Sequence, residues 1–243
     1  MKNIIFLIPF YNEEKNLIKL VKMIKASSLK NNFKYKILFL NDCSTDNSSK
    51  IITDYVKINK ESNILIHQNT NNLGHGKSLL KLFDLVKEYI NSATEIVTLD
   101  SDMKIKSEDF NEIFLFKSSV VCKRKRLEEG IFRGVITLFA EFLVFTKTGK
   151  LWRDANCPFR LYRIEDFRLV SELIPKNLMT PNIVLTIILI KLKIPVVRKN
   201  IELIYDIKNS GVTWQGSNPF SKYVKLLQFS YNSFLEVWKL KFD

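Results

Sequence analysis

Two acidic residues in the sequence are spaced to hold a divalent cation. Asp100 and Asp102 flank Ser101 directly after an apolar segment, so in an extended chain both carboxylates point to the same side. Carboxylate oxygens are the ligands that Mg2+ and Mn2+ prefer, and such a cation can bridge protein carboxylates and the phosphates of a nucleotide. Acidic pairs also cap helices or end strands in many proteins, so this pattern gains meaning only from its neighbours.

A second polar cluster, residues 41–46, follows another apolar segment. Its acidic residues Asp42 and Asp46 flank Ser44 and Thr45, and their oxygens can accept hydrogen bonds from a base or a ribose. Asp46 alone also suits a second interpretation, as the N-cap of the helix that follows. The cluster therefore predicts nucleotide binding, with two possible roles for Asp46.

A glycine-rich segment, Gly74-His75-Gly76-Lys77-Ser78, has the composition of a phosphate-binding P-loop but not its spacing. The position five residues before Gly76 is Asn71, so the first glycine of that motif is missing and an ATPase or GTPase is disfavoured. Backbone N–H groups at the start of the next helix could still face a phosphate, with Lys77 as a point charge. We interpret both histidines, His67 and His75, as structural.

Basic residues cluster beside an amphipathic segment in the second half. Lys123-Arg124-Lys125-Arg126 and Arg133 accompany residues 131–145, which carry phenylalanines and aliphatic residues at helical spacing. One interpretation is a charged loop beside a core helix, and the other is an interface for an anionic lipid headgroup. The C-terminal residues 219–243 repeat aromatic residues among lysines and suit the same two interpretations.

Alternating elements position these segments. Apolar runs predict buried strands, and apolar residues at helical spacing predict the helices between them. The strands are expected at residues 4–10, 35–40, 64–67 and 95–99, and the helices at residues 13–26, 46–60 and 77–90. This alternation predicts a doubly wound, mostly parallel sheet, whose ligands bind at the carboxyl ends of the strands. We expect the polar segments to meet at that edge.

The second half is less regular, but the same signals extend through it. Strands are expected at residues 118–122, 157–163, 194–197 and 201–205, and helices at 131–145, near Glu165, at 180–191 and at 219–239. No linker or internal repeat interrupts the chain. We therefore expect one catalytic domain over residues 1–218, followed by an amphipathic helical tail over residues 219–243.

Composition limits the setting in which such a protein works. The formal net charge of +13 predicts an anionic partner, such as nucleic acid, a membrane surface or a phosphorylated ligand, unless it belongs to a solvated surface. Three cysteines without a CxxC pair suggest neither disulfides nor zinc. No apolar stretch approaches the ~18 to 20 residues that span a bilayer. We expect a cytoplasmic protein, peripheral on the inner face of the cell membrane.

Taken together, four segments resemble the successive nucleotide-sugar motifs of family 2 glycosyltransferases. They are residues 8–14 (IPFYNEE), 41–46 (NDCSTD), 72–74 (NLG) and 100–102 (DSD), in the order and spacing of that family. The resemblance implies the GT-A fold and a GDP- or UDP-linked sugar donor. The donor-binding residues that it implies are Pro9, Tyr11, Glu13, Asp42, Ser44, Asp46, Asn72, Lys77, Asp100 and Ser101. Asp100 and Asp102 would hold Mg2+ or Mn2+.

The second half is similar to the dolichol-phosphate mannosyltransferase and polyprenyl-phosphate glycosyltransferase branch. The similarity covers Cys122-Lys123-Arg124, the segment from Arg133, and residues 154–160 (DANCPFR). It implies a dolichyl or undecaprenyl phosphate acceptor, whose charge Arg124 and Arg133 would hold. Lys104 stands where this branch usually has glutamine, and an ammonium cannot coordinate a cation. The metal would then have fewer protein ligands, or Lys104 would partly replace its charge.

The implied chemistry is an inverting transfer, in which an acceptor oxygen attacks the anomeric carbon in line. A phosphate acceptor is already a nucleophile. A sugar hydroxyl, as in surface-polysaccharide assembly, needs a general base, for which Asp154 is the candidate. Asp154 could equally order the loop before the next strand. A non-catalytic nucleic-acid or membrane-binding protein would explain the net charge but none of the four motifs, so we expect no nucleic acid partner.

Overall fold

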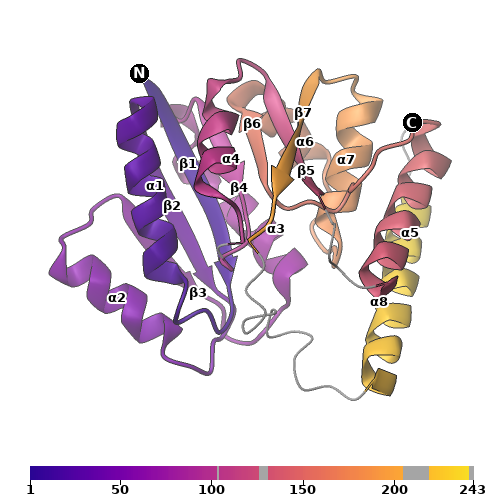
Figure 1. The fold of residues 1–243 in the computed structure, drawn as a ribbon, viewed down its shortest axis with the longest axis horizontal. Coiled ribbons are helices and arrows are strands. Elements are labelled where there is room, and N and C mark those ends of the chain that lie inside the picture. The colour runs from indigo at the N-terminus through magenta and orange to yellow at the C-terminus, as the bar shows by residue number, and fades with distance from the viewer. Residues whose placement is uncertain (103, 126–130, 205–218, 241–243) are drawn as a thin grey trace.

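Apolar runs of the sequence form the strands of one mixed sheet. The computed structural model describes residues 1–102, 104–125, 131–204 and 219–240, and within them the sheet has seven strands (Figure 1). The strands are β1 (Lys2–Phe10), β2 (Phe33–Asn41), β3 (Ile64–Gln68), β4 (Glu95–Thr98), β5 (Ser119–Lys125), β6 (Arg160–Arg163) and β7 (Val196–Glu202).

The strand order is β3-β2-β1-β4-β6-β5-β7. Four pairs are parallel: β1 with β2, β1 with β4, β2 with β3, and β5 with β7. Strand β6 runs antiparallel to both of its neighbours, β4 and β5. The predicted mostly parallel, doubly wound sheet is thereby confirmed, with the chain reversing at β6.

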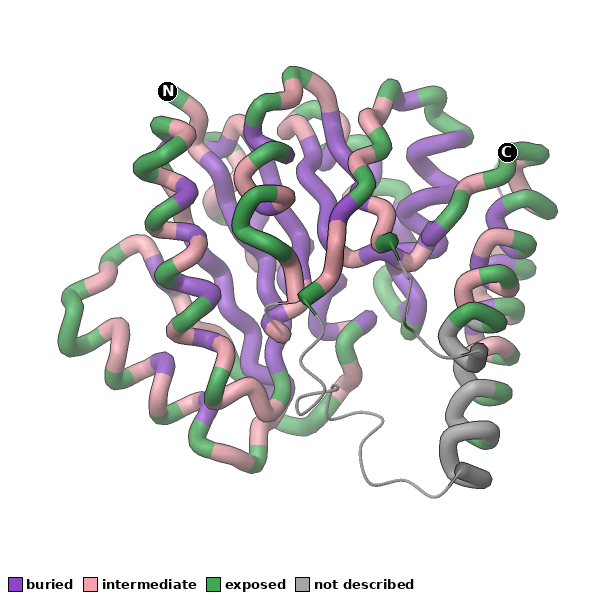
Figure 2. The backbone as a smooth tube through the Cα atoms, viewed as in Figure 1, coloured by how far each residue is buried: buried purple, intermediate pink, exposed green. Residues whose placement is uncertain are grey.

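Helices cover both faces of the sheet. They are α1 (Leu17–Asn31), α2 (Ser48–Ile58), α3 (His75–Leu85), α4 (Ser107–Glu112), α5 (Ile131–Thr148), α6 (Ile164–Leu173), α7 (Pro181–Lys191) and α8 (Pro219–Lys239), with short 3-10 helices at Val86–Glu88, Ile90–Ser92 and Ile113–Leu115. Side chains alternate along β1: Ile5 and Leu7 pack with α3, α6 and α7, whereas Phe6 and Ile8 pack with α1 and α4. Figure 2 shows the buried strands between these two layers.

Helix α7 is enclosed on all sides. Every residue from Pro181 to Ile190 is buried, because α3 and α6 contact α7, and α5 and α8 also pack against it. A helix that is apolar around its whole circumference is expected in such a position. Helix α8 is fastened there by the Glu236 carboxylate, which accepts hydrogen bonds from the backbone N–H groups of Met179 and Thr180 at 2.5 and 3.0 Å.

Several predicted elements differ from the structure. Residues 194–197 and 201–205 were predicted as two strands, but one strand, β7, pairs with β5 from Val196 to Glu202. Polar residues separate the two predicted strands, but β7 lies at the edge of the sheet, where charged side chains are common. Strand β6 begins at Arg160 rather than at residue 157, and α3 ends at Leu85. Helix α4 was not predicted, because six residues are too few to show a helical period.

Candidate donor and acceptor site

The predicted polar segments meet at one edge of the sheet. Phe10, the last residue of β1, lies opposite Asn41 at the end of β2, and Asn41 lies opposite Gln68 at the end of β3. The chain therefore leaves these three parallel strands at the same level, and β4 ends at Thr98 beside them. Carboxyl ends of parallel strands are where such sheets bind ligands.

The segment after β1 is joined to the segment after β2 by side chains of both. The Ser44 hydroxyl accepts a hydrogen bond from the Asn12 backbone N–H at 3.1 Å, and Asn12 Oδ1 accepts one from the Thr45 N–H at 2.8 Å. Asp46 accepts from the backbone N–H groups of Glu14 and Ser48 at 3.3 and 2.9 Å. The second interpretation of Asp46, as the N-cap of this helix, is wrong, because Asn47 is the N-cap residue of α2; Asp46 instead accepts from the first backbone N–H of the helix, that of Ser48.

The carboxylate of Asp42 organises the loop before α3. Asp42 is 3% exposed, and its Oδ1 accepts hydrogen bonds from Asn69 Nδ2 and the Leu73 backbone N–H, both at 2.8 Å. Its Oδ2 accepts from the Gly74 N–H at 2.8 Å, which fixes Gly74 in a left-handed conformation at φ 84°. These contacts set where α3 begins and bring its first residues to the site edge.

The first turn of α3 is pressed against the segment before α7. A Cβ atom added to Gly76 would lie 2.2 Å from the backbone oxygen of Met179, so this position has room only for glycine. Residues on either side of Gly76 are therefore held in place by the body of the protein. One of them is His75, which we had interpreted as structural.

His75 contacts a predicted donor-binding residue, a partner that the sequence did not reveal, and its structural role stays a prediction. Its Nε2 atom lies 2.8 Å from Oδ1 of Asp100, and Lys104 Nζ lies 2.8 Å from Oδ2 of Asp102. Each carboxylate of the acidic pair thus has its own basic neighbour. Only the position of His75 at a predicted helix start, between two glycines, could have indicated this.

The acidic residues of this edge influence each other's ionisation. Burial and the neighbouring charge of Asp100 raise the pKa of Asp102, although Lys104 opposes this effect. Burial also raises the pKa of Glu13, and the charges of Asp102 and Asp100 add to the increase. For Asp100, the charges of His75, Arg124 and Lys104 outweigh burial and lower the pKa. Added positive charge would stabilise this cluster of carboxylates.

The acidic pair fits a divalent cation in part. The Oδ1 atom of Asp100 is buried and, within the described part of the chain, receives no aligned hydrogen bond despite the nearby imidazole. A buried carboxylate oxygen without an aligned hydrogen bond, beside a second carboxylate, suits Mg2+ or Mn2+, which often use one or two carboxylates together with phosphate oxygens and water. Among the described residues, no three acidic, histidine or cysteine side chains form a complete metal cage.

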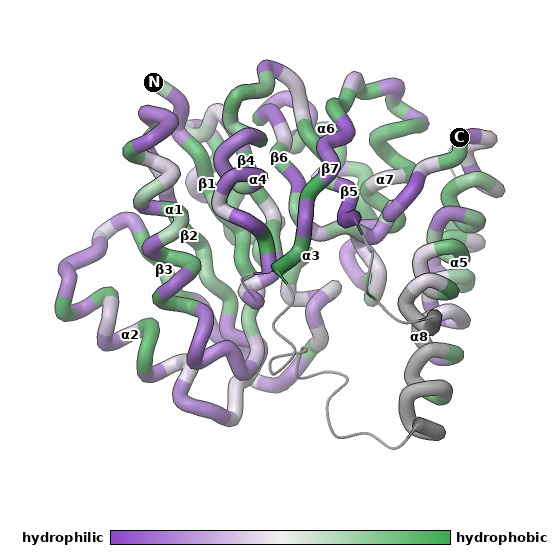
Figure 3. Tube along the Cα trace, in the orientation of Figure 1, coloured by the Kyte–Doolittle hydropathy of each residue, from purple (hydrophilic) through white to green (hydrophobic). Residues whose placement is uncertain are grey.

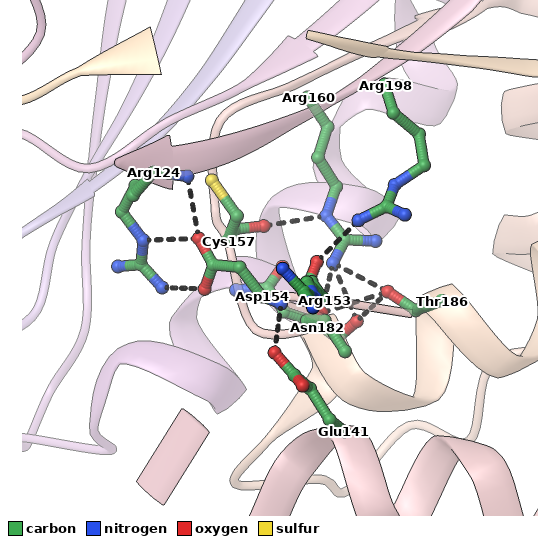
Figure 4. A network of polar contacts seen from close by, with 10 residues as sticks. Arg124, Glu141, Arg153, Asp154, Cys157, Arg160, Asn182, Thr186 and Arg198 are labelled. Atoms are coloured by element: carbon green, nitrogen blue, oxygen red, sulfur yellow. Dashed lines mark hydrogen bonds and ion pairs between the residues drawn. The ribbon is translucent and has the colours of Figure 1, made fainter. Parts of the chain in front are cut away.

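Arg124 and Asp154 form a clamp at the end of β5. Asp154 accepts hydrogen bonds from the Arg124 backbone N–H and Nε, both at 2.9 Å, and from Nη2 at 2.7 Å (Figure 4). The side chain of Asp154 is 4% exposed and that of Arg124 is 18% exposed. Burial disfavours the charge of Arg124, but Asp154 outweighs it, so the pKa of Arg124 is raised. The clamp holds a permanent cation whose charge also reaches Asp100.

Asp154 lies in a strained backbone conformation. Its φ of 54° is left-handed, which aspartate tolerates better than most residues. Its N–H donates to Glu141 Oε1 of α5 at 3.0 Å, so α5 helps to hold the turn. We refer to the paired side chains of Arg124 and Asp154 as the acceptor clamp.

The other predicted site residues occupy varied positions. Pro9 is buried within β1, Tyr11 is 38% exposed just beyond it, and Ser101 is buried after β4. Asn72 is exposed, and Lys77 is partly buried in the first turn of α3. Arg133 belongs to α5, but its side chain lies outside the described part of the structure. Ligand contacts of all these residues stay predictions.

Comparison with known proteins identifies the family. The family model described as "Glycosyl transferase family 2" matches residues 5–165 of the chain. It therefore belongs to glycosyl transferase family 2, and the predicted family is confirmed. The match includes the segments after β1 to β4 and the acceptor clamp.

Curated relatives share low identity with the chain. An "undecaprenyl-phosphate 4-deoxy-4-formamido-L-arabinose transferase" of Pectobacterium atrosepticum is 25% identical over 167 residues, covering 67% of this chain and 49% of that protein. The protein of the same name from Klebsiella pneumoniae is 23% identical and covers 100% of this chain and 78% of its own length. The chain spans about half the length of the first of these relatives.

Solved structures confirm the GT-A fold. Glucosyl-3-phosphoglycerate synthase from Mycobacterium tuberculosis, in complex with phosphoglyceric acid, superposes with a TM-score of 0.65 at 15% identity, covering 100% of this chain and 82% of that one. Mannosyl-3-phosphoglycerate synthase from Rubrobacter xylanophilus superposes with a TM-score of 0.64 at 11% identity. The superposition covers 97% of this chain and 73% of that one. A complex of the mycobacterial enzyme with Mn2+, UDP-glucose and phosphoglyceric acid superposes with a TM-score of 0.64 at 14% identity, covering 100% of this chain and 81% of that one.

Proposed function

We propose that this member of glycosyl transferase family 2 is an inverting enzyme that transfers a sugar from a nucleoside diphosphate to a polyprenyl phosphate. The acceptor clamp carries the proposal. Both oxygens of Asp154 are engaged by Arg124, so this carboxylate is poorly placed to take a proton from a sugar hydroxyl. An acceptor phosphate needs no base, and its charge suits a fixed guanidinium. The names of the curated relatives, which specify undecaprenyl phosphate, support the same acceptor class.

The reaction balances without a proton acceptor. An oxygen of the acceptor phosphate forms a bond to the anomeric carbon, while the bond from that carbon to the donor diphosphate breaks and its electron pair leaves with the diphosphate. Attack from the opposite side inverts the configuration. Arg124, assisted by Arg133, would hold the acceptor phosphate in line with the donor, because orientation contributes much of the rate in such reactions.

The donor would occupy the edge formed by the segments after β1 to β4. Glu13, Asp42 and Asp46 would face the nucleoside, and Asp100 and Asp102 would face the diphosphate. A bound Mg2+ or Mn2+ would neutralise charge on the departing diphosphate. Lys104 Nζ, at 2.8 Å from Asp102, is placed to contribute a further positive charge there.

We also propose that the protein binds its lipid acceptor at a membrane surface. Two neighbouring helices carry exposed apolar side chains: Val135, Leu138, Phe142 and Phe145 on α5, and Leu227, Tyr231, Phe234 and Trp238 on α8. We call these residues the α5–α8 apolar face. Figures 1 and 3 show the two helices side by side and the hydrophobic residues along α5.

The α5–α8 apolar face has the spacing and charge of an interfacial surface. Its members recur every three or four residues on each helix, which places them on one stripe. Lys147 Nζ donates to the backbone oxygen of Trp238 at 3.2 Å and lies 5.6 Å from its ring, so a cation borders the stripe. Aromatic residues beside lysines suit an anionic bilayer. No helix among the described residues is both long and apolar enough to traverse a bilayer.

The acceptor is tested by transfer of label. The protein is incubated with radiolabelled nucleotide sugars and a short polyprenyl phosphate, and the matched control is the same polyprenol without its phosphate. We expect label in the organic phase only with the phosphate, in a product labile to mild acid. Transfer to free sugar hydroxyls, with none to the lipid phosphate, would instead support a glycan-extending enzyme of surface-polysaccharide assembly.

The membrane surface is tested by sedimentation with vesicles. We expect binding to vesicles that contain phosphatidylglycerol, weaker binding at high salt, and a clear loss of binding in Phe142→Glu. Leu115→Glu is the matched control, since Leu115 is 72% exposed but lies outside the α5–α8 apolar face. Equal binding by the two variants would show that another surface meets the lipid.

A further inference from the structure

A fully buried arginine lies behind the acceptor clamp. Arg160, the first residue of β6, is 0% exposed and is among the largest fully buried side chains of the described residues. Its guanidinium donates hydrogen bonds to the backbone oxygens of Ala155 and Cys157, both at 2.8 Å, and to that of Asn182 at 2.7 Å. It also donates to the Thr186 hydroxyl at 3.0 Å. One side chain thus joins the 155–157 turn to α7.

The partners of Arg160 are neutral. Within the described part of the chain, its hydrogen bonds go to backbone oxygens and to the hydroxyls of Thr186 and Tyr162, and to no carboxylate. Burying a cation without an opposite charge is costly, so the hydrogen bonds of Arg160 to buried backbone oxygens must offset that cost. The guanidinium therefore stays buried only while the 155–157 turn and α7 keep these acceptors in place.

The 155–157 turn, to which Arg160 is bonded, determines the orientation of the Asp154 side chain. Ala155 directly follows Asp154, and the Cys157 N–H donates to the Asp154 backbone oxygen at 3.1 Å, closing the turn. Thr186 adds a second tie, since its hydroxyl lies 2.9 Å from the Ala155 oxygen. With φ of 54° at Asp154, the turn depends on such ties to direct the carboxylate at Arg124 (Figure 4).

We infer that Arg160 is a positioning residue for Arg124: by fixing the 155–157 turn against α7, it holds the Asp154 carboxylate so that Arg124 presents its guanidinium to the acceptor phosphate. This inference rests on the proposed role of Arg124 toward the acceptor. Arg160 itself is sealed from solvent and touches no substrate. Its effect should fall on acceptor binding and leave the donor edge unchanged, because the Arg160 guanidinium donates to the 155–157 turn, to α7 and to Tyr162 and to none of the predicted donor-binding side chains in the described part of the chain.

Three variants test this inference. Arg160→Lys keeps the charge, but an ammonium cannot reach acceptors in both the turn and α7 with the fork geometry of a guanidinium. Thr186→Val keeps the side-chain shape and removes the hydroxyl that contacts both Arg160 and the Ala155 oxygen, so it provides a folded test where Arg160→Lys does not fold. Arg163→Lys is the matched control, because Arg163 lies on the same strand but pairs with Glu95 at 2.9 Å, away from the clamp.

Two measurements are made on each variant. In protein labelled with 15N-arginine, the Nε–H resonance of Arg124, assigned from its loss in Arg124→Lys, reports the hydrogen bond to Asp154 without any substrate. Steady-state kinetics give the KM for polyprenyl phosphate, and the Kd for the nucleotide reports the donor edge. We expect Arg160→Lys to shift the resonance and raise the acceptor KM about tenfold or more, with the donor Kd within about twofold.

Thr186→Val should shift the Arg124 resonance and raise the acceptor KM in the same directions as Arg160→Lys, but by smaller amounts. Arg163→Lys should leave the resonance and the acceptor KM unchanged. An unshifted Arg124 resonance with a normal acceptor KM in the folded variants would overturn the inference, as would an equal loss of donor and acceptor binding. If the wild type does not use polyprenyl phosphate at all, the proposed function fails, whereas the resonance still decides whether Arg160 positions Arg124.

Discussion

Replacing Asp154 by asparagine isolates the carboxylate of the acceptor clamp. Asparagine has nearly the same shape and tolerates the left-handed conformation at φ 54°, so backbone strain is not added. It keeps one oxygen, whereas the carboxylate accepts from Arg124 through both oxygens. The variant therefore loses at least one charge-assisted hydrogen bond and leaves the Arg124 charge without its partner.

The expected losses of stability and of acceptor binding follow from the burial of the Arg124–Asp154 pair. Removing one partner of a buried ion pair costs about 3–5 kcal/mol, and the 18% exposure of Arg124 favours the lower end. At ~2–4 °C per kcal/mol for a chain of this size, a loss of about 3 kcal/mol should lower Tm by about 6–12 °C. One charge-assisted hydrogen bond is worth ~1.5–3 kcal/mol, so a released Arg124 should raise the acceptor KM at least about tenfold.

The assay measures Tm by calorimetry and KM for polyprenyl phosphate at saturating donor, with donor binding as the control. A Tm within about 2 °C of wild type and an unchanged acceptor KM would refute the reasoning. A collapse of kcat with an unchanged acceptor KM, together with loss of the acidic limb of the pH profile, would make Asp154 a general base and favour a hydroxyl acceptor.

Three further predictions concern the donor edge and the thiols. Asp102→Asn should abolish transfer while Tm stays close to wild type, and near-normal turnover would remove Asp102 from the diphosphate site. Lys104→Gln should raise the divalent-ion concentration needed for nucleotide binding, measured by calorimetric titration; identical metal titrations would show that Lys104 supplies no compensating charge. At pH 8, iodoacetamide should modify the partly exposed Cys43 in the native protein and spare Cys157, whose pKa burial raises to about 11, so that its thiol stays protonated; mass spectrometry of alkylated peptides that showed Cys157 modified first would contradict this.

The first half of the fold was predictable because each element carries its own signal. Strands β1 to β4 are apolar runs, and the helices between them have apolar residues at helical spacing, so local pattern and tertiary position agree. The second half departs from this rule. Strand β7 carries Arg198, Lys199 and Asn200 in its centre, and only pairing with β5 at the sheet edge shows it to be one strand.

The site was predictable as a set of segments but not as a set of contacts. Asp42 was expected to meet a nucleotide, and its oxygens are largely engaged by the loop that starts α3. His75 was missed because its partner, Asp100, comes from a different strand end, and no spacing rule connects them. Arg160 was part of a recognised motif, yet its burial against α7 depends on helix packing that the sequence does not display.

The charges of the site explain why basic residues surround an acidic pair. The proposed reaction brings together two anions, a nucleoside diphosphate and a lipid phosphate, at an edge that already holds Glu13, Asp100 and Asp102. Without compensation these charges would repel one another strongly in a partly buried site. Lys104 contacts Asp102, and Arg124 is held by a buried carboxylate that comes from neither substrate. Because Asp154 holds Arg124 through Nε and Nη2, the side of the guanidinium that Asp154 does not occupy could face the acceptor phosphate of the proposed reaction, while the charge of Arg124 also reaches Asp100. The same cation can therefore reduce repulsion between donor and acceptor, which a mobile lysine at the surface could not do with equal geometric precision.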